Sequence, residues 1–286
     1  MRDDFAIFIM SYNRPENVAS LGSLKKSGYT GRWYIIIGDD DPKVAEYKAT
    51  YGEKVVVFSK QEYVQKTDRM GLDITKVICF ARNACFDIAE SVGVKFFQQF
   101  DDDYSGYYIA YDENMQYVNT RHRVKSYDTT AENLISFFEG MPDKCLAVSF
   151  SQGGDFIGGH SENNWGLSKV RKCMNSWLCA TDRRFSFSGC MNEDVSAYTS
   201  LQAKGYFFIN IMQYRLQQPV TQSSSGGMSA IYKQYGTHAK SFLTVIQNPS
   251  FTKIAVITNN HQRLHHRIDW RQCASKIVRQ TNKKDA

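Results

Sequence analysis

The stretch from Lys95 to Tyr104, KFFQQFDDDY, constrains this chain more than any other, because a β-type apolar run ends there in three consecutive carboxylates. Its phenylalanines are typical of a buried strand. Asp101, Asp102 and Asp103 would repel one another unless water or a cation neutralised them. Hard cations such as Mg²⁺ or Mn²⁺ prefer carboxylate oxygen and keep positions for substrate phosphates. The stretch therefore indicates either a nucleotide and metal site at a strand's carboxyl end or a solvated acidic turn.

Length and composition predict a globular chain. The 286 residues, 42% of them hydrophobic, are enough for one large domain, or one domain with an extension, around a real core. The net charge of +6 suits a polyanionic partner, although many ordinary enzymes carry as much. Seven scattered cysteines without CxxC spacing indicate reduced, packed thiols. With neither a signal peptide pattern nor a membrane-spanning apolar run, we expect a soluble, cytoplasmic protein.

Strand and helix patterns alternate in the first third of the chain. The expected strands are Phe5 to Met10, Trp33 to Ile37, Val55 to Phe58 and the run that ends in the Asp triplet. Pro15 and Pro42 each open a helical segment, and a longer helix is expected between Asp73 and Ser91, with Arg82 off its buried face. This order predicts a mainly parallel sheet with ligands at the carboxyl edge of its strands. Since no GxGxxG or Walker A pattern occurs, side chains and metal would hold a nucleotide.

Further elements follow the triplet. They are aromatic strands around a turn from Tyr104 to Val118, a helix from Thr130 to Phe138 behind a Thr cap, a strand from Cys145 to Phe150, and a strand from Ile254 to Ile257. Gly153 to His160 is either a hairpin or a close approach of backbone to ligand, and Gln222 to Ser229 is linker-like. Glu193 and Asp194 open a helix that Asn192 could cap. Local physics alone explains this pair as acids favoured in a first helical turn.

The segments FAIFIMSYNRP, YIIIGDDDP, the ARN-containing helix from Ala81 to Ala89 and FDDDY resemble, in order and spacing, the nucleotide-binding half of GT-A glycosyltransferases. The resemblance implies an α/β, Rossmann-like GT-A fold, in which helices flank a mixed, mainly parallel sheet. It divides a single domain into a nucleotide-sugar-binding half (residues 1–104) and an acceptor-binding, catalytic half (105–220). Residues 221–286 would add a flexible loop and a basic helical C-terminal extension.

The same resemblance implies a set of site residues. The nucleotide would lie among Ser11, Tyr12, Asn13, Arg14, Asp39, Asp40, Arg82, Asp101 and Asp102. Asp101 and Asp103 would hold Mn²⁺ or Mg²⁺, although Asp102 leaves the register of this pair open. Because GT-A enzymes often complete the metal site with a C-terminal histidine, His261, His265 and His266 are candidates. His261 and His265 would share a face of a helix, and a basic solvated face is the alternative.

The acidic pair has a second interpretation under this resemblance. Either Glu193 or Asp194 would act as the base that deprotonates the acceptor in an inverting enzyme, and the sequence leaves open which one does so.

A narrower resemblance covers nearly the whole chain. FDDDY, NEDV, SSGGM and HHRIDW look like the phage-type DNA base glycosyltransferases associated with TET/JBP-like hydroxylases. This implies a UDP-sugar donor, a hydroxymethylated pyrimidine in DNA as acceptor, and action in the host cytoplasm. The basic residues that would contact phosphates, or merely solubilise the chain, are Arg263, Arg267, Arg271, Lys276, Arg279, Lys283 and Lys284. A saccharide or protein glycosyltransferase and a non-catalytic nucleotide-binding module are the alternatives.

Overall fold

A computed structural model describes residues 1–156, 167–168, 173, 175–218, 236–258 and 262–273. Its first half alternates strands and helices. The strands are β1 (Phe5–Met10), β2 (Arg32–Gly38), β3 (Val55–Phe58) and β4 (Phe96–Asp101), and the helices are α1 (Ala19–Lys26), α2 (Val44–Tyr51), α3 (Lys60–Lys66) and α4 (Cys79–Ser91). The strands lie in the order β3-β2-β1-β4 and every neighbouring pair is parallel. Their carboxyl ends therefore meet at one edge.

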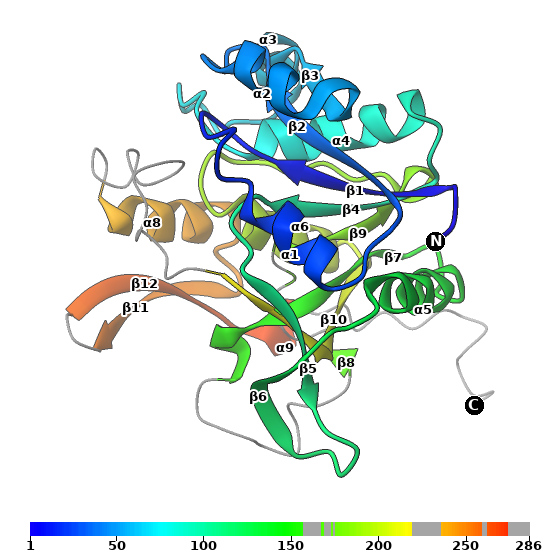
Figure 1. The fold of residues 1–286 in the computed structure, drawn as a ribbon. Helices are drawn as coiled ribbons and strands as arrows, with labels where there is room; N and C mark the ends of the chain where they lie inside the picture. Colours follow the sequence, from blue (N-terminus) through cyan, green and yellow to red (C-terminus); the bar gives the residue numbers. More distant parts are fainter. Residues whose placement is uncertain (157–166, 169–172, 174, 219–235, 259–261, 274–286) are drawn as a thin grey trace.

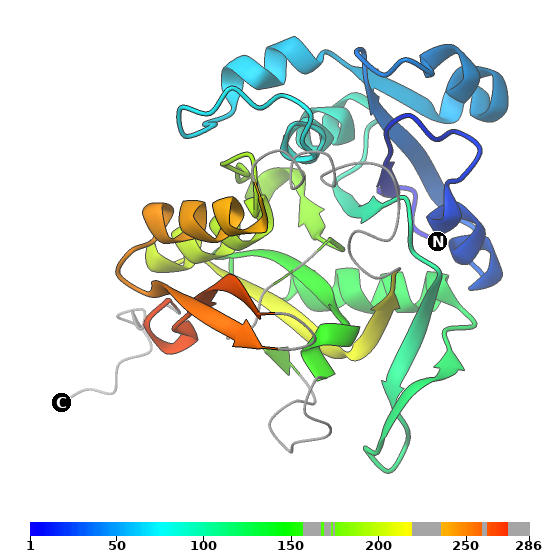
Figure 2. The same ribbon diagram turned by 90° about the vertical axis from the view of Figure 1, so that its left-hand side faces the viewer.

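The second half extends the same sheet. Its elements are β5 (Gly106–Tyr111), β6 (Tyr117–Arg123), α5 (Tyr127–Glu139), β7 (Cys145–Gln152), β8 (Leu167–Ser168), β9 (Leu178–Ala180), α6 (Glu193–Ala203) and β10 (Phe207–Gln217). Among the described residues the sheet has ten strands, in the order β3-β2-β1-β4-β9-β7-β10-β5-β6 with β8 beside β10. Helices flank this sheet, as the two views of Figures 1 and 2 show. The predicted α/β architecture, a mixed sheet flanked by helices, is confirmed.

The core explains why β1 has no polar residue. Phe5, Ile7 and Ile9 point into one apolar cluster, together with residues of α1 and α5. The alternate residues of the strand, such as Phe8, point into a second cluster that contains α4 and α6. Side chains of a strand alternate between the two faces of its sheet, so a strand covered on both sides must be apolar throughout. All six residues of β1 are buried.

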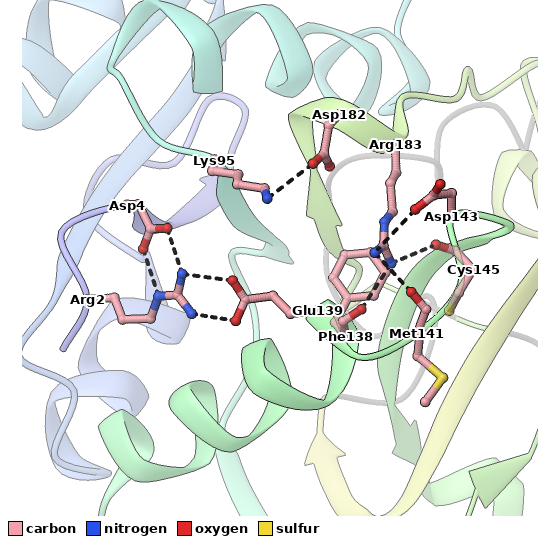
Figure 3. A network of polar contacts seen from close by, with 10 residues as sticks. All are labelled: Arg2, Asp4, Lys95, Phe138, Glu139, Met141, Asp143, Cys145, Asp182 and Arg183. Atoms are coloured by element: carbon pink, nitrogen blue, oxygen red, sulfur yellow. Dashed lines mark hydrogen bonds and ion pairs between the residues drawn. The ribbon is translucent and has the colours of Figure 1, made fainter.

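Polar contacts fasten the amino ends of the strands, opposite the acidic edge (Figure 3). Just before β1, Arg2 pairs with Asp4 and reaches Glu139 of α5, with N···O distances of 2.8 Å to each. Arg183 donates to the carbonyl oxygens of Phe138 and Met141, both at 3.0 Å. These contacts hold α5 at the edge of the sheet where the first strands begin. The acidic residues lie at the opposite edge, where those strands end.

Two predicted helices begin later than expected. Helix α1 begins at Ala19 rather than at Pro15, because the backbone N–H of Asn17 bonds to the carbonyl of Arg14 in a separate turn. Helix α4 begins at Cys79 rather than near Asp73, and Ile74 packs in a small separate cluster. The prediction that Arg82 lies off the buried face was also wrong, since Arg82 is only 1% exposed.

The N-caps of two helices also differ from those predicted. Helix α5 begins at Tyr127, and the hydroxyl of Ser126, not a threonine, accepts the cap hydrogen bond, from the N–H of Thr129 at 3.3 Å. Asn192 occupies the N-cap position of α6, but its side chain makes no cap bond and its backbone is left-handed, with φ of 54°. Of the Gly153–His160 segment, residues Gly153–Phe156 form a 3₁₀ turn, and the rest lies outside the described residues, as does Gln222–Ser229.

The described part of the C-terminal extension is not uniformly helical. It contains α8 (Thr237–Gln247), a two-stranded antiparallel sheet of β11 (Thr252–Thr258) and β12 (Gln262–Ile268), and the short α9 (Trp270–Cys273). His265 and His266 therefore lie on a strand, so the helix face expected for His261 and His265 does not form. His261 itself is outside the described residues.

The predicted cysteine chemistry is confirmed, since all seven cysteines are buried and unbridged. Among the described helices, none has the length and apolar character needed to cross a bilayer.

Candidate active site

Helix α1 fixes the backbone of the Asp triplet at the end of β4. The hydroxyl of Ser20 donates to the carbonyl of Asp101 at 2.5 Å and accepts the N–H of Tyr104 at 2.9 Å. The N–H of Ser20 donates to the carbonyl of Asp102 at 3.0 Å. These bonds satisfy the polar backbone where the chain leaves the sheet, so the three carboxylates have defined positions.

Asp102 points inward and anchors the loop after β1. Its carboxylate accepts hydrogen bonds from the hydroxyl of Ser11 at 2.5 Å and from Nε of Arg14 at 2.7 Å, and the residue is 1% exposed. Burial raises the pKa of Asp102, while Arg14 and Ser11 oppose that rise. Since Asp102 is bonded and almost fully buried, whereas Asp101 and Asp103 are only partly buried, the geometry favours Asp101 and Asp103 as the pair available to a ligand.

A second buried acid holds the same loop from the side of β2. Asp41 is 4% exposed, and its carboxylate accepts the backbone N–H groups of Asn13 at 2.7 Å and Lys43 at 2.8 Å. Asn13 has a left-handed backbone, with φ of 58°. The sequence interpretation passed over Asp41 in favour of its neighbours, although an Asp directly before Pro42 is a common turn signal.

The other predicted residues of this edge lie around Lys60, which is the second residue the sequence interpretation missed. Asp39 accepts the backbone N–H of Lys60 at 3.0 Å, and Asp40 pairs with its ammonium group at 2.8 Å. The same ammonium group lies 5.4 Å from the ring centroid of Tyr12. The loops after β1 and β2 therefore meet in one place, as the order of parallel strands predicts.

A buried arginine joins this edge to the acidic pair. Arg82 on α4 donates from Nη2 to Asp101 at 3.0 Å and from Nε to Glu193 at 3.2 Å. Nη2 also lies 3.2 Å from the side-chain oxygen of Asn175, a further residue that the sequence interpretation missed. The chain separations are large, so no local pattern could have indicated the cluster. Arg82 brings the Asp triplet and the first turn of α6 together.

Burial dominates the electrostatics of the acids around Arg82. It raises the pKa of Asp101 to about 7, against the opposing effect of Arg82, and Asp103 adds to the rise. Burial, followed by the charge of Asp194, likewise raises the pKa of Glu193, and Arg82 opposes this. Both carboxylates are therefore costly to keep charged, and a further positive charge beside them would be favourable.

Asp194 differs from Glu193 in its partners. It is 8% exposed, and within the described residues its carboxylate makes no hydrogen bond or ion pair. Asn192, just before the pair, donates from its side chain to the carbonyl of Lys240 at 3.1 Å and lies 3.3 Å from Nδ1 of His266. The start of α6 is therefore held from two sides, by α4 and by the C-terminal elements, and within the described residues neither holds the Asp194 carboxylate.

The acids at the end of β4 fit a hard divalent cation. Asp101 has a side chain that is 20% exposed, and one buried carboxylate oxygen of Asp103 has no hydrogen-bond partner within the described residues. The described residues contain no group of three His, Cys, Asp or Glu side chains placed to hold a metal, so neither His265 nor His266 completes such a group here. Mg²⁺ commonly takes one or two carboxylates and completes its shell with water and substrate phosphates, which is what this pair offers.

We expect Arg82→Gln to destabilise the fold by about 3–5 kcal/mol at pH 8, because two buried carboxylates lose their cation. The loss should shrink toward pH 5, since Asp101 and Glu193, whose pKa values are already raised, can then take up protons. Urea unfolding at both pH values measures this.

Arg184→Gln is the matched control. Arg184 also pairs with two acids, Asp87 and Glu90, but its side chain is 42% exposed, so its loss should cost about 0–1 kcal/mol. Equal losses of unfolding free energy in the two variants would contradict the prediction that burial decides how much each arginine contributes.

Comparison with known proteins places the chain. The sequence model of the TET-associated glycosyltransferase family matches residues 5–227. No curated protein sequence matches. Among solved structures, glucosyl-3-phosphoglycerate synthase from Mycobacterium tuberculosis, in complex with Mn²⁺, UDP and phosphoglyceric acid, is 8% identical with a TM-score of 0.48, covering 96% of this chain and 88% of that one. S. aureus TarS 1–349 is 13% identical with a TM-score of 0.43, covering 85% and 65%. With most of its length matched by the family, this chain belongs to the TET-associated glycosyltransferases.

Proposed function

We propose that this glycosyltransferase moves a sugar from a UDP-sugar to the hydroxyl of a hydroxymethylated pyrimidine in DNA, in the cytoplasm, with Mn²⁺ or Mg²⁺ as cofactor. The observation that carries the proposal is the Arg82 network, which brings the acidic end of β4 beside the acidic start of α6. A donor site and a catalytic carboxylate must adjoin for group transfer. A hydroxylase that acts on pyrimidine methyl groups would supply the acceptor hydroxyl, in keeping with the TET association of the family.

The donor end is formed by the loops after β1, β2 and β4. Asp41 accepts the backbone N–H of Asn13, and Asp102 accepts from the side chains of Ser11 and Arg14, so this loop is preorganised beside the strand ends. Asp101 and Asp103 would hold the cation, which when bound would neutralise the donor's diphosphate and stabilise it as leaving group. Residues 1–104 thus form the nucleotide-sugar-binding half of the proposal, and residues 105–220 its acceptor and catalytic half.

We assign the base to Asp194. Glu193 is held by Arg82, whereas the carboxylate of Asp194 is uncommitted within the described residues. In the transfer, the acceptor oxygen forms a bond to the anomeric carbon and gives its proton to Asp194. The bond between that carbon and the diphosphate oxygen breaks, and the nucleoside diphosphate leaves with the electron pair. A single displacement of this kind inverts the anomeric configuration.

Asp103→Asn should lower metal-dependent UDP affinity at least about tenfold while the fold persists, because an amide is a weaker ligand for a hard cation than a carboxylate. Titration calorimetry with Mn²⁺ and with EDTA measures this. Asp143→Asn, at the amino edge of the sheet and 96% exposed, is the control and should bind UDP as the wild type does. Unchanged affinity in the Asp103 variant would remove Asp103 from the metal site.

Asp194→Asn should reduce kcat about 10²–10⁴-fold with little change in donor affinity, because a general base acts only in the transition state. Glu193→Gln should instead lower the melting temperature, because it weakens the buried pair with Arg82. Release of nucleoside diphosphate gives kcat, and calorimetry gives donor affinity. If the pair only complements the helix dipole, each variant would cost about 0.3–1 kcal/mol of stability and keep its turnover, which would overturn the base assignment.

The acceptor is tested by incubating the enzyme with a panel of UDP and GDP sugars, Mn²⁺ and hydroxymethylcytosine DNA, followed by mass spectrometry of the nucleosides. We expect a sugar mass increment on the modified base with a UDP-sugar and none in the Asp194→Asn variant. Donor hydrolysis without DNA modification would favour a saccharide or protein acceptor. Nucleotide binding without hydrolysis or transfer would favour a non-catalytic module.

A further inference from the structure

The β11–β12 ribbon lies beyond the part of the chain that the family model matches, which ends at residue 227. Its two strands pair in antiparallel register from Thr252 opposite Ile268 to Thr258 opposite Gln262. Figure 1 shows the ribbon below α8, at the side of the molecule away from α5. The ribbon is therefore an addition to the matched glycosyltransferase core, and the family match assigns it no function.

The inner face of the ribbon packs on the protein at its base. Thr252 is 4% exposed, and its cross-strand neighbour Ile268 packs against the core cluster of α4 and α6. His266, on the same face, lies 3.3 Å from Asn192. Alternate residues of a strand point to opposite faces, so the residues between these point outward.

The outer face is basic. Register places Lys253 opposite Arg267, and Ile257 opposite Arg263, so the three cations share this face, and all three are exposed. The described residues of the two strands include no Asp or Glu. Arg263 and Arg267 are four residues apart, roughly 13 Å along a strand. That distance matches about four nucleotide steps of a duplex along its axis.

We infer that the outer face of the β11–β12 ribbon binds the phosphate backbone of duplex DNA through Lys253, Arg263 and Arg267. This inference rests on the proposed function, in which DNA is the acceptor. It names the surface of the protein that would bind the duplex. Three exposed cations on a face to which the described strands contribute no acid favour contact with phosphates, which needs positive charge at suitable spacing.

The position of the ribbon supports this assignment. His266 contacts Asn192, the residue directly before Glu193 and Asp194, so the end of strand β12 lies beside the first turn of α6. Arg267 follows His266 in the chain. Because neighbouring residues of a strand point to opposite faces, the outer face lies across the ribbon from these acids, and an extruded base would reach them around the edge of the ribbon.

The test measures binding of a hydroxymethylcytosine duplex by fluorescence anisotropy between 50 and 200 mM KCl. In the variant Lys253→Gln, Arg263→Gln, Arg267→Gln, affinity should fall and the slope of log K against log salt should become shallower by about 0.9 for each lost contact, about 2.7 in all. The exchange Lys253→Arg, Arg263→Lys, Arg267→Lys should keep the wild-type slope, because phosphate contacts need charge rather than side-chain shape.

A second triple variant controls for net charge. Lys26→Gln, Lys48→Gln, Lys144→Gln removes the same charge from exposed positions elsewhere and should leave the slope within about 0.9 of wild type. Donor hydrolysis should be equal in all variants. The ribbon inference is overturned if its triple variant binds DNA as the wild type does, or loses no more slope than the control, or if the wild type binds no duplex at 50 mM. A wild type that binds duplex but adds no sugar to the base overturns the proposed function instead, because the slope alone decides the role of the ribbon.

Discussion

The site depends on the buried guanidinium of Arg82. A buried cation is tolerated only when carboxylates and hydrogen bonds replace its hydration, and here Asp101 does so at Nη2 and Glu193 at Nε. The carboxylates depend on the arginine in turn. Burial raises the pKa of Asp101 and of Glu193, and the charge of Arg82 opposes that rise. The end of β4, helix α4 and the start of α6 are therefore held together by the ion pairs of Arg82, which would set the distance between the proposed donor and acceptor sites.

The acids at the carboxyl edge divide into two kinds. Asp41 and Asp102 are almost fully buried and use their oxygens on the loop after β1, through the backbone of Asn13 and the side chain of Arg14. Asp101 and Asp103 are left nearer to solvent. An open loop at the edge of a parallel sheet has backbone N–H groups that strands cannot satisfy, so some carboxylates must serve the loop before others can serve a ligand.

Sequence reasoning succeeded where a property is local. An apolar run such as β1 can be assigned because this strand is covered on both faces, and the order of strands then places the acids at one edge. It failed where a distant partner decides. The helical spacing around Arg82 left this residue off the buried face, because the pattern contains no information about Asp101 or Glu193. Similarly, the four-residue spacing of His261 and His265 suggested a helix face, whereas pairing with β11 makes the segment a strand.

The two ends of the proposed reaction differ in how they are built. The donor end comes from consecutive strand and loop units within the first 104 residues, all on one parallel sheet. The acceptor side combines the start of α6 with α8 and β12, since Asn192 contacts both Lys240 and His266. Because these contacts reach α6 from outside the sheet, residues on the outer face of the ribbon can change without disturbing Arg82 or the strand ends. Such an arrangement lets acceptor recognition diverge while the donor site and its charge balance are kept.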